Sequence, residues 1–175
     1  MLPIKKIIIP ELLTKETVRA LLSFHPSPFK NHEGILYWGG YDFNDTVIVA
    51  TCVVPKATSG PQEVHTTPEA NAEVISYLNK HGMTLIAQVH SHPKDLKRHS
   101  AGDDKFTFMP YDGYFSVVVP FYARKAMSPL TMCGFHMYHR GKFHVMPDNW
   151  TMQNVKMIPG YVDLRGNKNG LTHFK

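Results

Sequence analysis

Four residues near the middle of the sequence have the types and spacing of a catalytic metal site: His90, His92, Ser100 and Asp103. The apolar run before His90 is typical of a β-strand, and residues two apart on a strand point to the same face. The two imidazoles are therefore expected side by side at a strand end. Ser100 and Asp103 are three residues apart, so a single helical turn places both on one face.

The chemistry of these side chains favours a bound metal ion. Imidazole nitrogens and a carboxylate are ligands that zinc takes in proteins, and three such ligands leave a fourth tetrahedral position for water. An open fourth position is typical of a catalytic site. A histidine pair alone is a weak signal in a chain with 11 histidines, but serine and aspartate at fixed offsets strengthen it. Residues 93–99 are long enough to turn the chain back over the histidines.

The remaining histidines carry no comparable pattern. His99 adjoins the motif but falls outside the ligand spacing, so it is expected to be a loop side chain. Asp104 follows the ligand aspartate and is expected to point elsewhere. Other histidines are scattered over loops and strands and are expected to serve no site: His65, His136, His139 and His144.

A helix and a strand are expected directly before the motif. Thr67 is suited to cap a helix that has Pro68 in its first turn, and Gly82 is suited to end it. The following residues, 84–89, have the composition of a strand and lead into His90. The motif therefore lies at the end of a strand that a helix precedes.

The other elements predict an α/β fold. An early helix is expected from Lys15 to about His25, with Thr14 as its cap. Residues 55–66 have the composition of a loop, and no element is assigned after Pro147. Further strands are expected at 34–38, 46–54, 114–119, 132–138 and 142–146. This order predicts a mixed β-sheet flanked by helices.

Length and composition restrict the function classes. The chain has 175 residues, enough for one domain, expected to comprise 1–146 with 147–175 as a polar C-terminal extension of that domain. The net charge of +5 comes from scattered basic residues in the C-terminal third, without the interleaved aromatics of a nucleic-acid platform. Cys52 and Cys133 form no metal-binding pair and are expected to be buried thiols. No signal peptide or membrane span is expected, so a cytoplasmic location is predicted.

The spacing H-x-H-x7-S-x2-D resembles the signature of the JAMM metalloproteases, also called the JAB or MPN-plus domain. The resemblance covers about residues 5–146, and the compact sequence is similar to the prokaryotic branch of the family. It implies one curved mixed sheet with a helix packed on either side, in a layering like that of cytidine deaminases. It also implies one zinc ion per chain, held by His90, His92 and Asp103.

The family's motif includes a glutamate on an early strand, and Glu33, ahead of Gly34-Ile35-Leu36, is the matching residue. Of the six glutamates, Glu33 is the one that opens a strand with apolar neighbours, while Glu63 lies in a loop and is the reserve. The resemblance implies that Glu33 is the general base and that Ser100 donates a hydrogen bond to the oxyanion. Ser100 is equally suited to cap the helix that carries Asp103, and the sequence leaves both roles open.

The resemblance implies a zinc-dependent isopeptidase or peptidase that cleaves after the C-terminal tail of a ubiquitin-like protein. Its partners would be that protein or its conjugates, with E1-like and E2-like enzymes, as in bacterial antiphage conjugation systems. Processing of a sulfur-carrier protein with a Gly-Gly tail is an alternative. A non-catalytic scaffold is a second, although such family members characteristically lack the histidine and aspartate ligands. A hydrolase of small amides or cell-wall peptides is a third.

Overall fold

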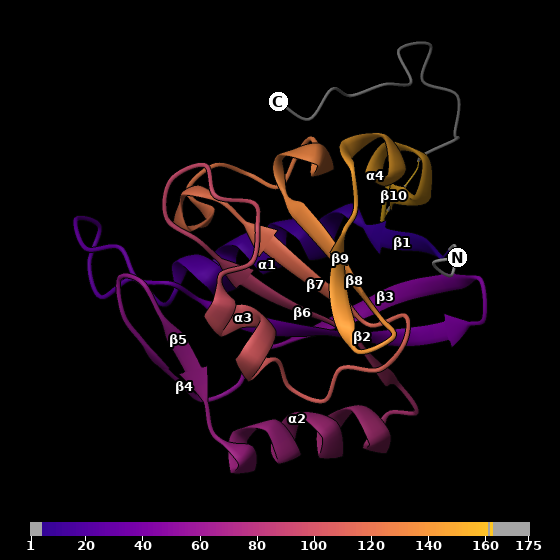
Figure 1. Ribbon diagram of the computed structural model, residues 1–175, viewed down its shortest axis with the longest axis horizontal. Coiled ribbons are helices and arrows are strands. Elements are labelled where there is room, and N and C mark those ends of the chain that lie inside the picture. The colour runs from indigo at the N-terminus through magenta and orange to yellow at the C-terminus, as the bar shows by residue number, and fades with distance from the viewer. Residues whose placement is uncertain (1–4, 161, 163–175) are drawn as a thin grey trace.

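The computed structural model describes residues 5–160 and 162, and an eight-stranded mixed sheet forms its centre (Figure 1). Along the sheet the strand order is β10-β1-β3-β2-β6-β7-β8-β9, and β4 pairs with β5 as a separate hairpin. The strands are β1 (Lys6–Pro10), β2 (Ile35–Phe43), β3 (Thr46–Val53), β4 (Ala57–Ser59), β5 (Val64–Thr66), β6 (Thr84–Ser91), β7 (Phe115–Val119), β8 (Gly134–His139), β9 (Lys142–Val145) and β10 (Val155–Ile158). The helices are α1 (Glu11–Leu22), α2 (Pro68–Lys80), α3 (Ala101–Phe106) and α4 (Asp148–Asn154), with short 3-10 turns at Phe121–Ala123 and Leu130–Met132.

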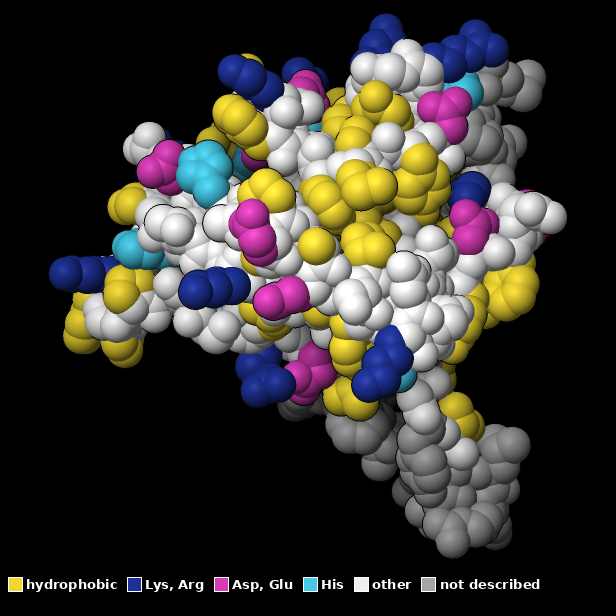
Figure 2. Space-filling model, turned by 90° about the horizontal axis from the view of Figure 1, so that it is seen from below, with side chains coloured by type: hydrophobic (Ala, Val, Ile, Leu, Met, Phe, Trp, Pro, Cys, Tyr) yellow, Lys and Arg dark blue, Asp and Glu magenta, His cyan; other side chains and the backbone are white. Residues whose placement is uncertain are grey.

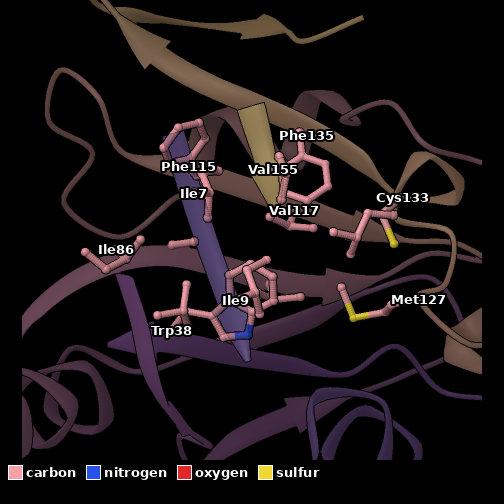
Figure 3. Close-up of a cluster of buried hydrophobic side chains, with 14 of the residues drawn as sticks. Ile7, Ile9, Trp38, Ile86, Phe115, Val117, Met127, Cys133, Phe135 and Val155 are labelled. Atoms are coloured by element: carbon pink, nitrogen blue, oxygen red, sulfur yellow. The ribbon is translucent and has the colours of Figure 1, made fainter. Parts of the chain in front are cut away.

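Helices cover both faces of the sheet, because alternate residues of its central strands point to opposite sides. Leu36 and Trp38 belong to a buried cluster with Leu21 of α1, and Trp150 of α4 packs against the same cluster. Figure 3 shows this cluster, in which Trp38, Ile86, Phe115 and Phe135 pack together with Ile7 and Ile9 of β1. On the opposite face, a second cluster places α2 against the sheet through Val74 and Leu78. The predicted single α/β domain with a curved mixed sheet flanked by helices is confirmed.

The elements that lead to the motif form as expected. The Thr67 side chain accepts a hydrogen bond from the amide of Ala70 at 3.2 Å, and Pro68 occupies the first turn of α2. Gly82 follows the helix with a φ of 65°, a conformation that costs glycine nothing. β6 then runs parallel to β7, and antiparallel to β2 on its other side.

The first helix begins earlier than expected. Thr14 is not its cap but lies inside α1, where its hydroxyl donates to the carbonyl oxygen of Glu11 at 2.8 Å. Pro10 occupies the cap position, since β1 runs directly into the helix and the fixed φ of proline is compatible with the first helical turn. The helix also ends earlier, at Leu22.

Three further segments differ from the sequence expectation. β2 continues through Gly39-Gly40, where the register against β3 shifts. The two strands approach so closely there that a Cβ at Gly40 would lie 1.9 Å from the carbonyl oxygen of Ile48, so glycine is required. The segment 55–66, expected to be a loop, contains the β4–β5 hairpin. After Pro147, α4 and β10 form, and β10 adds to the sheet beside β1. The proposed extension 147–175 also includes residue 161 and residues 163–175, which lie outside the described residues.

Both cysteines are free thiols, but only Cys133 is fully buried; Cys52 is half-buried. Within the part of the chain that the structure describes, no helix has the length and apolar character needed to cross a membrane.

Candidate metal centre

The candidate centre lies at the carboxyl end of β6. His90 pairs with Ile35 of β2 and with Val118 of β7, so strands enclose it on both sides. The amide of His92 donates to the carbonyl oxygen of Val119 at 2.9 Å, which keeps the chain extended beyond the strand end. Both imidazoles therefore emerge on one face, as expected, and both are buried, with exposures of 1% and 6%.

The three expected ligands converge. The Nε2 atoms of His90 and His92 lie 3.1 Å apart. Asp103 places Oδ1 at 3.3 Å from Nε2 of His90 and Oδ2 at 3.1 Å from Nε2 of His92. Bond lengths of about 2.0–2.1 Å to a tetrahedral zinc ion separate neighbouring ligand atoms by roughly 3.3 Å, so these separations fit such an ion. Among the described residues, this is the one group of three such side chains that could hold a metal ion.

The protonation of these groups also suits metal binding. Burial lowers the pKa of His90 and favours its neutral form. Burial also favours a neutral Asp103, but hydrogen bonds from His90 and His92 outweigh this effect and bring the pKa of Asp103 well below its ordinary value. Neutral imidazole and ionised carboxylate are the forms that bind metals.

A capping box at the start of α3 fixes the Asp103 carboxylate. The amide of Ser100 donates to Oδ2 of Asp103 at 2.6 Å, and the Ser100 hydroxyl accepts from the amide of Asp103 at 3.2 Å. The capping role of Ser100 is thereby confirmed. Because the hydroxyl accepts here, its own proton is not used by this bond, and its oxyanion role stays a prediction.

The loop 93–99 packs on the start of β8 and brings α3 back over β6. The Lys97 ammonium donates to the carbonyl oxygen of Thr131 at 2.8 Å. A Cβ at Gly134 would lie 1.8 Å from the carbonyl oxygen of Lys97, so only glycine permits this approach. The position of Asp103 therefore depends on a backbone contact far away in the sequence.

Glu33 lies two residues before the start of β2 and is 6% exposed. Its amide donates to the carbonyl oxygen of Gly60 at 2.8 Å, and its own carbonyl oxygen accepts from the Ser59 hydroxyl at 2.7 Å. The pKa of Glu33 is raised to about 7, mainly by burial; His92 opposes the increase, and the negative charges of Asp103 and Glu63 add to it. A carboxyl group with a pKa near neutrality can both accept and donate a proton.

The reserve residue, Glu63, is placed differently. Its side chain is 70% exposed and its carboxylate lies 3.2 Å from Nε2 of His65. Gly34, next to Glu33, exchanges hydrogen bonds with Ser91 at the end of β6, so Glu33 lies beside the segment that carries His90 and His92, whereas Glu63 lies at the surface of the β4–β5 hairpin.

A family model of prokaryotic homologs of the JAB domain matches residues 29–142. The chain belongs to this family. The matched residues include Glu33 and all of the H-x-H-x7-S-x2-D motif. The JAB resemblance drawn from the motif is thereby confirmed.

The chain is also similar to a curated protein and to two solved structures. A probable metalloprotease from Sinorhizobium fredii, y4jG, is 29% identical over 122 residues, which cover 67% of this chain and 75% of the relative. The solution structure of protein DSY2949 from Desulfitobacterium hafniense has a TM-score of 0.64 at 15% identity, covering 87% of this chain and 93% of its own, and shares the fold. AF2198, a JAB1/MPN domain protein from Archaeoglobus fulgidus, has a TM-score of 0.43 at 21% identity, with 81% and 96% of the two chains covered.

Beside the three candidate metal ligands lies a polar cluster that the sequence pattern did not predict. His99 lies in the loop before α3, as expected, but its side chain is only 5% exposed and its Nδ1 lies 2.7 Å from Oδ1 of Asp104. Its Nε2 lies 2.8 Å from the Ser116 hydroxyl, and its ring stacks on His136 with 3.8 Å between centroids. The position of His99 one residue before the Ser100 cap, with an aspartate five residues later, was the available signal.

Proposed function

We propose that this JAB-domain protein is a zinc-dependent peptidase that cleaves a peptide or isopeptide bond after the C-terminal tail of a ubiquitin-like protein. The observation that carries the proposal is the convergence of two imidazoles and a carboxylate beside a buried glutamate with a raised pKa. The relative that is named a probable metalloprotease supports the hydrolase class.

His90, His92 and Asp103 would hold the metal through Nε2, Nε2 and the carboxylate. When bound, zinc supplies Lewis acidity and lowers the pKa of a water ligand toward about 7. Glu33 accepts the proton of the attacking water, and its raised pKa makes the same carboxyl group a suitable donor to the leaving amine. The Ser100 hydroxyl donates to the carbonyl oxygen of the substrate as negative charge develops there.

The surroundings of the site suit an extended peptide. Among the described residues, β4 and β5 pair only with each other, so the hairpin has unpaired edges to which a strand can add. The hairpin lies beside α3 (Figure 1), and His65 of β5 contacts the ring of Phe106 at 5.9 Å between centroids. An extended tail paired with this edge would pass the metal ligands, as the C-terminal tail of a ubiquitin-like protein requires.

An apolar surface beside the site suits the folded body of such a partner. Figure 2 shows hydrophobic side chains gathered on the face that carries α2. A cavity of about 540 Å³ on the α2 side is lined by Pro68, Ala72, Ile75, Ser76, Asn79, Phe108 and Met109. Phe108 and Met109 lie just after α3 and its cap residue Thr107, so this surface is continuous with the segment that carries Asp103. Free thiols at Cys52 and Cys133 suit the reducing cytoplasm, where E1-like and E2-like partners would act.

Cleavage assays with zinc-loaded protein test the proposal. The substrates are a ubiquitin-like protein fused linearly to a reporter, the same protein joined to a lysine side chain, and a sulfur-carrier protein fused after its Gly-Gly tail. Cleavage of either of the first two, abolished by a chelator and restored by zinc, is the expected result. Cleavage of the sulfur-carrier fusion alone would assign the alternative substrate, and no cleavage of any fusion by zinc-loaded protein would contradict the proposal.

A further inference from the structure

A strained turn follows β7 at the edge of the candidate centre. Phe121, Tyr122 and Ala123 have φ values of 56°, 54° and 60°. Side chains with a Cβ rarely adopt this left-handed region, and three consecutive residues there persist only where their surroundings fix them. Such strain gathers at functional sites, so the contacts of this turn are informative.

One side of the turn is bound to the segment that carries a metal ligand. The amide of Tyr122 donates to the carbonyl oxygen of His92 at 2.7 Å, and the amide of Phe121 donates to that of Lys94 at 2.7 Å. Both bonds run to the chain immediately after β6. The backbone of Tyr122 is therefore fixed directly to His92.

The other side of the turn is bound to the segment that leads to Glu33. Nε2 of His25 lies 3.1 Å from the carbonyl oxygen of Tyr122, and its Nδ1 accepts from the amide of His32 at 3.0 Å. Because a carbonyl only accepts, the His25 proton lies on Nε2, and one neutral tautomer satisfies both bonds. Next to Tyr122, the guanidinium of Arg124 donates to Oδ1 of Asn31 at 2.6 Å.

The side chain of Tyr122 makes a third connection. Its hydroxyl donates to the carbonyl oxygen of Pro61 at 2.8 Å, in the turn of the β4–β5 hairpin. The neighbouring residue in that turn, Gly60, accepts the amide of Glu33, and Ser59 donates to the Glu33 carbonyl oxygen. The Tyr122 hydroxyl therefore holds the backbone to which Glu33 is itself bound.

We propose that Tyr122 is a positioning residue that sets the placement of Glu33 relative to the metal ligand His92. The inference rests on the proposed function, because it assigns Glu33 the proton transfer. The backbone of Tyr122 is hydrogen-bonded to His92, and the Tyr122 hydroxyl is hydrogen-bonded to the hairpin turn that fixes Glu33. Proton transfer depends steeply on such placement, since a displacement near 1 Å costs a rate factor of about 100.

Tyr122→Phe, which removes only the hydroxyl bond to Pro61, tests the proposal. The expected result is a decrease in kcat of about 10- to 100-fold with KM changed less than about twofold and with unchanged zinc content. The matched control is Tyr111→Phe, which removes a phenol bond of 2.6 Å to the carbonyl oxygen of Leu85, at the opposite end of β6 from His90. The control is expected to retain kcat.

Amide hydrogen exchange of Glu33, measured without substrate, separates this inference from the proposed function. Exchange at the Glu33 amide is expected to accelerate at least tenfold in Tyr122→Phe and to stay unchanged in Tyr111→Phe. An unchanged kcat, or an increase in KM with kcat preserved, would overturn the positioning role. If neither the unsubstituted protein nor any variant shows peptidase activity, the proposed function fails. Unchanged exchange of the Glu33 amide in Tyr122→Phe would independently refute the structural connection between Tyr122 and Glu33.

Discussion

Two buried histidine pairs lie close together in this protein, and they differ in geometry. In the first pair, His90 and His92 direct their Nε2 atoms toward each other at 3.1 Å, and the Asp103 carboxylate approaches both. In the second pair, His99 and His136 stack with 19° between their planes, and neither ring nitrogen of His136 has a hydrogen-bond partner among the described residues. Burial lowers the pKa of His90, His99 and His136 alike.

Burial and proximity therefore do not distinguish a metal centre from a packed pair; ring orientation and the nearby carboxylate do. Stacked imidazoles lie in nearly parallel planes, so their lone pairs do not point to a common position. Asp104, the carboxylate nearest to the second pair, binds His99 alone at 2.7 Å. Asp103 instead closes a triangle with the first pair, which is the arrangement that a metal ion requires.

The largest effect is expected from removing a ligand of the first pair. His90→Ala should abolish metal binding and cleavage, because two remaining ligands hold zinc poorly. Elemental analysis of purified protein and a cleavage assay measure both. The matched variant of the second pair is His136→Phe, in which zinc content should stay near one per chain. If His136→Phe lost zinc and His90→Ala kept it, the second pair would be the metal centre.

Glu33→Gln should keep the metal and lose activity. The amide has nearly the shape of the carboxyl group but accepts no proton, so kcat should decrease by about 10²–10⁴-fold. Zinc content and rate measured on the same sample test this separation. Glu63→Gln is the control, since this exposed side chain contacts His65 rather than the expected metal ligands. If Glu63→Gln lost activity while Glu33→Gln stayed fully active, Glu63 would be the general base instead.

A smaller effect on the first pair is expected from Gly134→Ala. The added Cβ would meet the Lys97 carbonyl oxygen at 1.8 Å, so the loop 93–99 must move and Asp103 with it. Because both histidines stay in place, zinc affinity should decrease by about 10- to 100-fold rather than vanish. Competition with a chromophoric chelator measures this affinity, and an unchanged value would show that the loop does not position the aspartate.

The second pair predicts a pH effect on the stability of the metal-free protein. Burial lowers the pKa of His136 to about 3, against 6.5 for the unfolded chain. A group whose pKa is lowered on folding stabilises the protein above the unfolded pKa, and this contribution decreases as the pH falls from 6.5 toward 3. Between pH 7 and pH 5 the unfolding free energy should therefore decrease by about 2 kcal/mol more than in His136→Phe. Urea unfolding of both proteins with a chelator present measures the difference, and parallel pH profiles would contradict it.

Local patterns predicted the part of the site that depends on neighbouring residues. The alternation through His90 and His92, the Ser100–Asp103 offset and the Thr67 cap each act within a few residues, and each forms as expected. The family's motif added Glu33, for which the local pattern alone was weak.

Features that depend on distant contacts could not be predicted in this way. His99 is buried because the loop 93–99 folds onto β8, a contact that Gly134 permits. Gly39-Gly40 resembles a strand end in sequence but forms an irregularity inside β2. Glycine is required there by the close approach of the Ile48 carbonyl oxygen on β3, a contact that the local sequence does not reveal. The turn at Tyr122 carries no glycine, so nothing in its composition indicates a left-handed backbone.

Anomalous diffraction at the zinc edge, from crystals of the purified zinc-loaded protein, would locate the bound metal. We expect one strong peak among Nε2 of His90, Nε2 of His92 and the Asp103 carboxylate. A peak between His99 and His136, or no peak beside Asp103 in zinc-loaded crystals, would contradict this expectation.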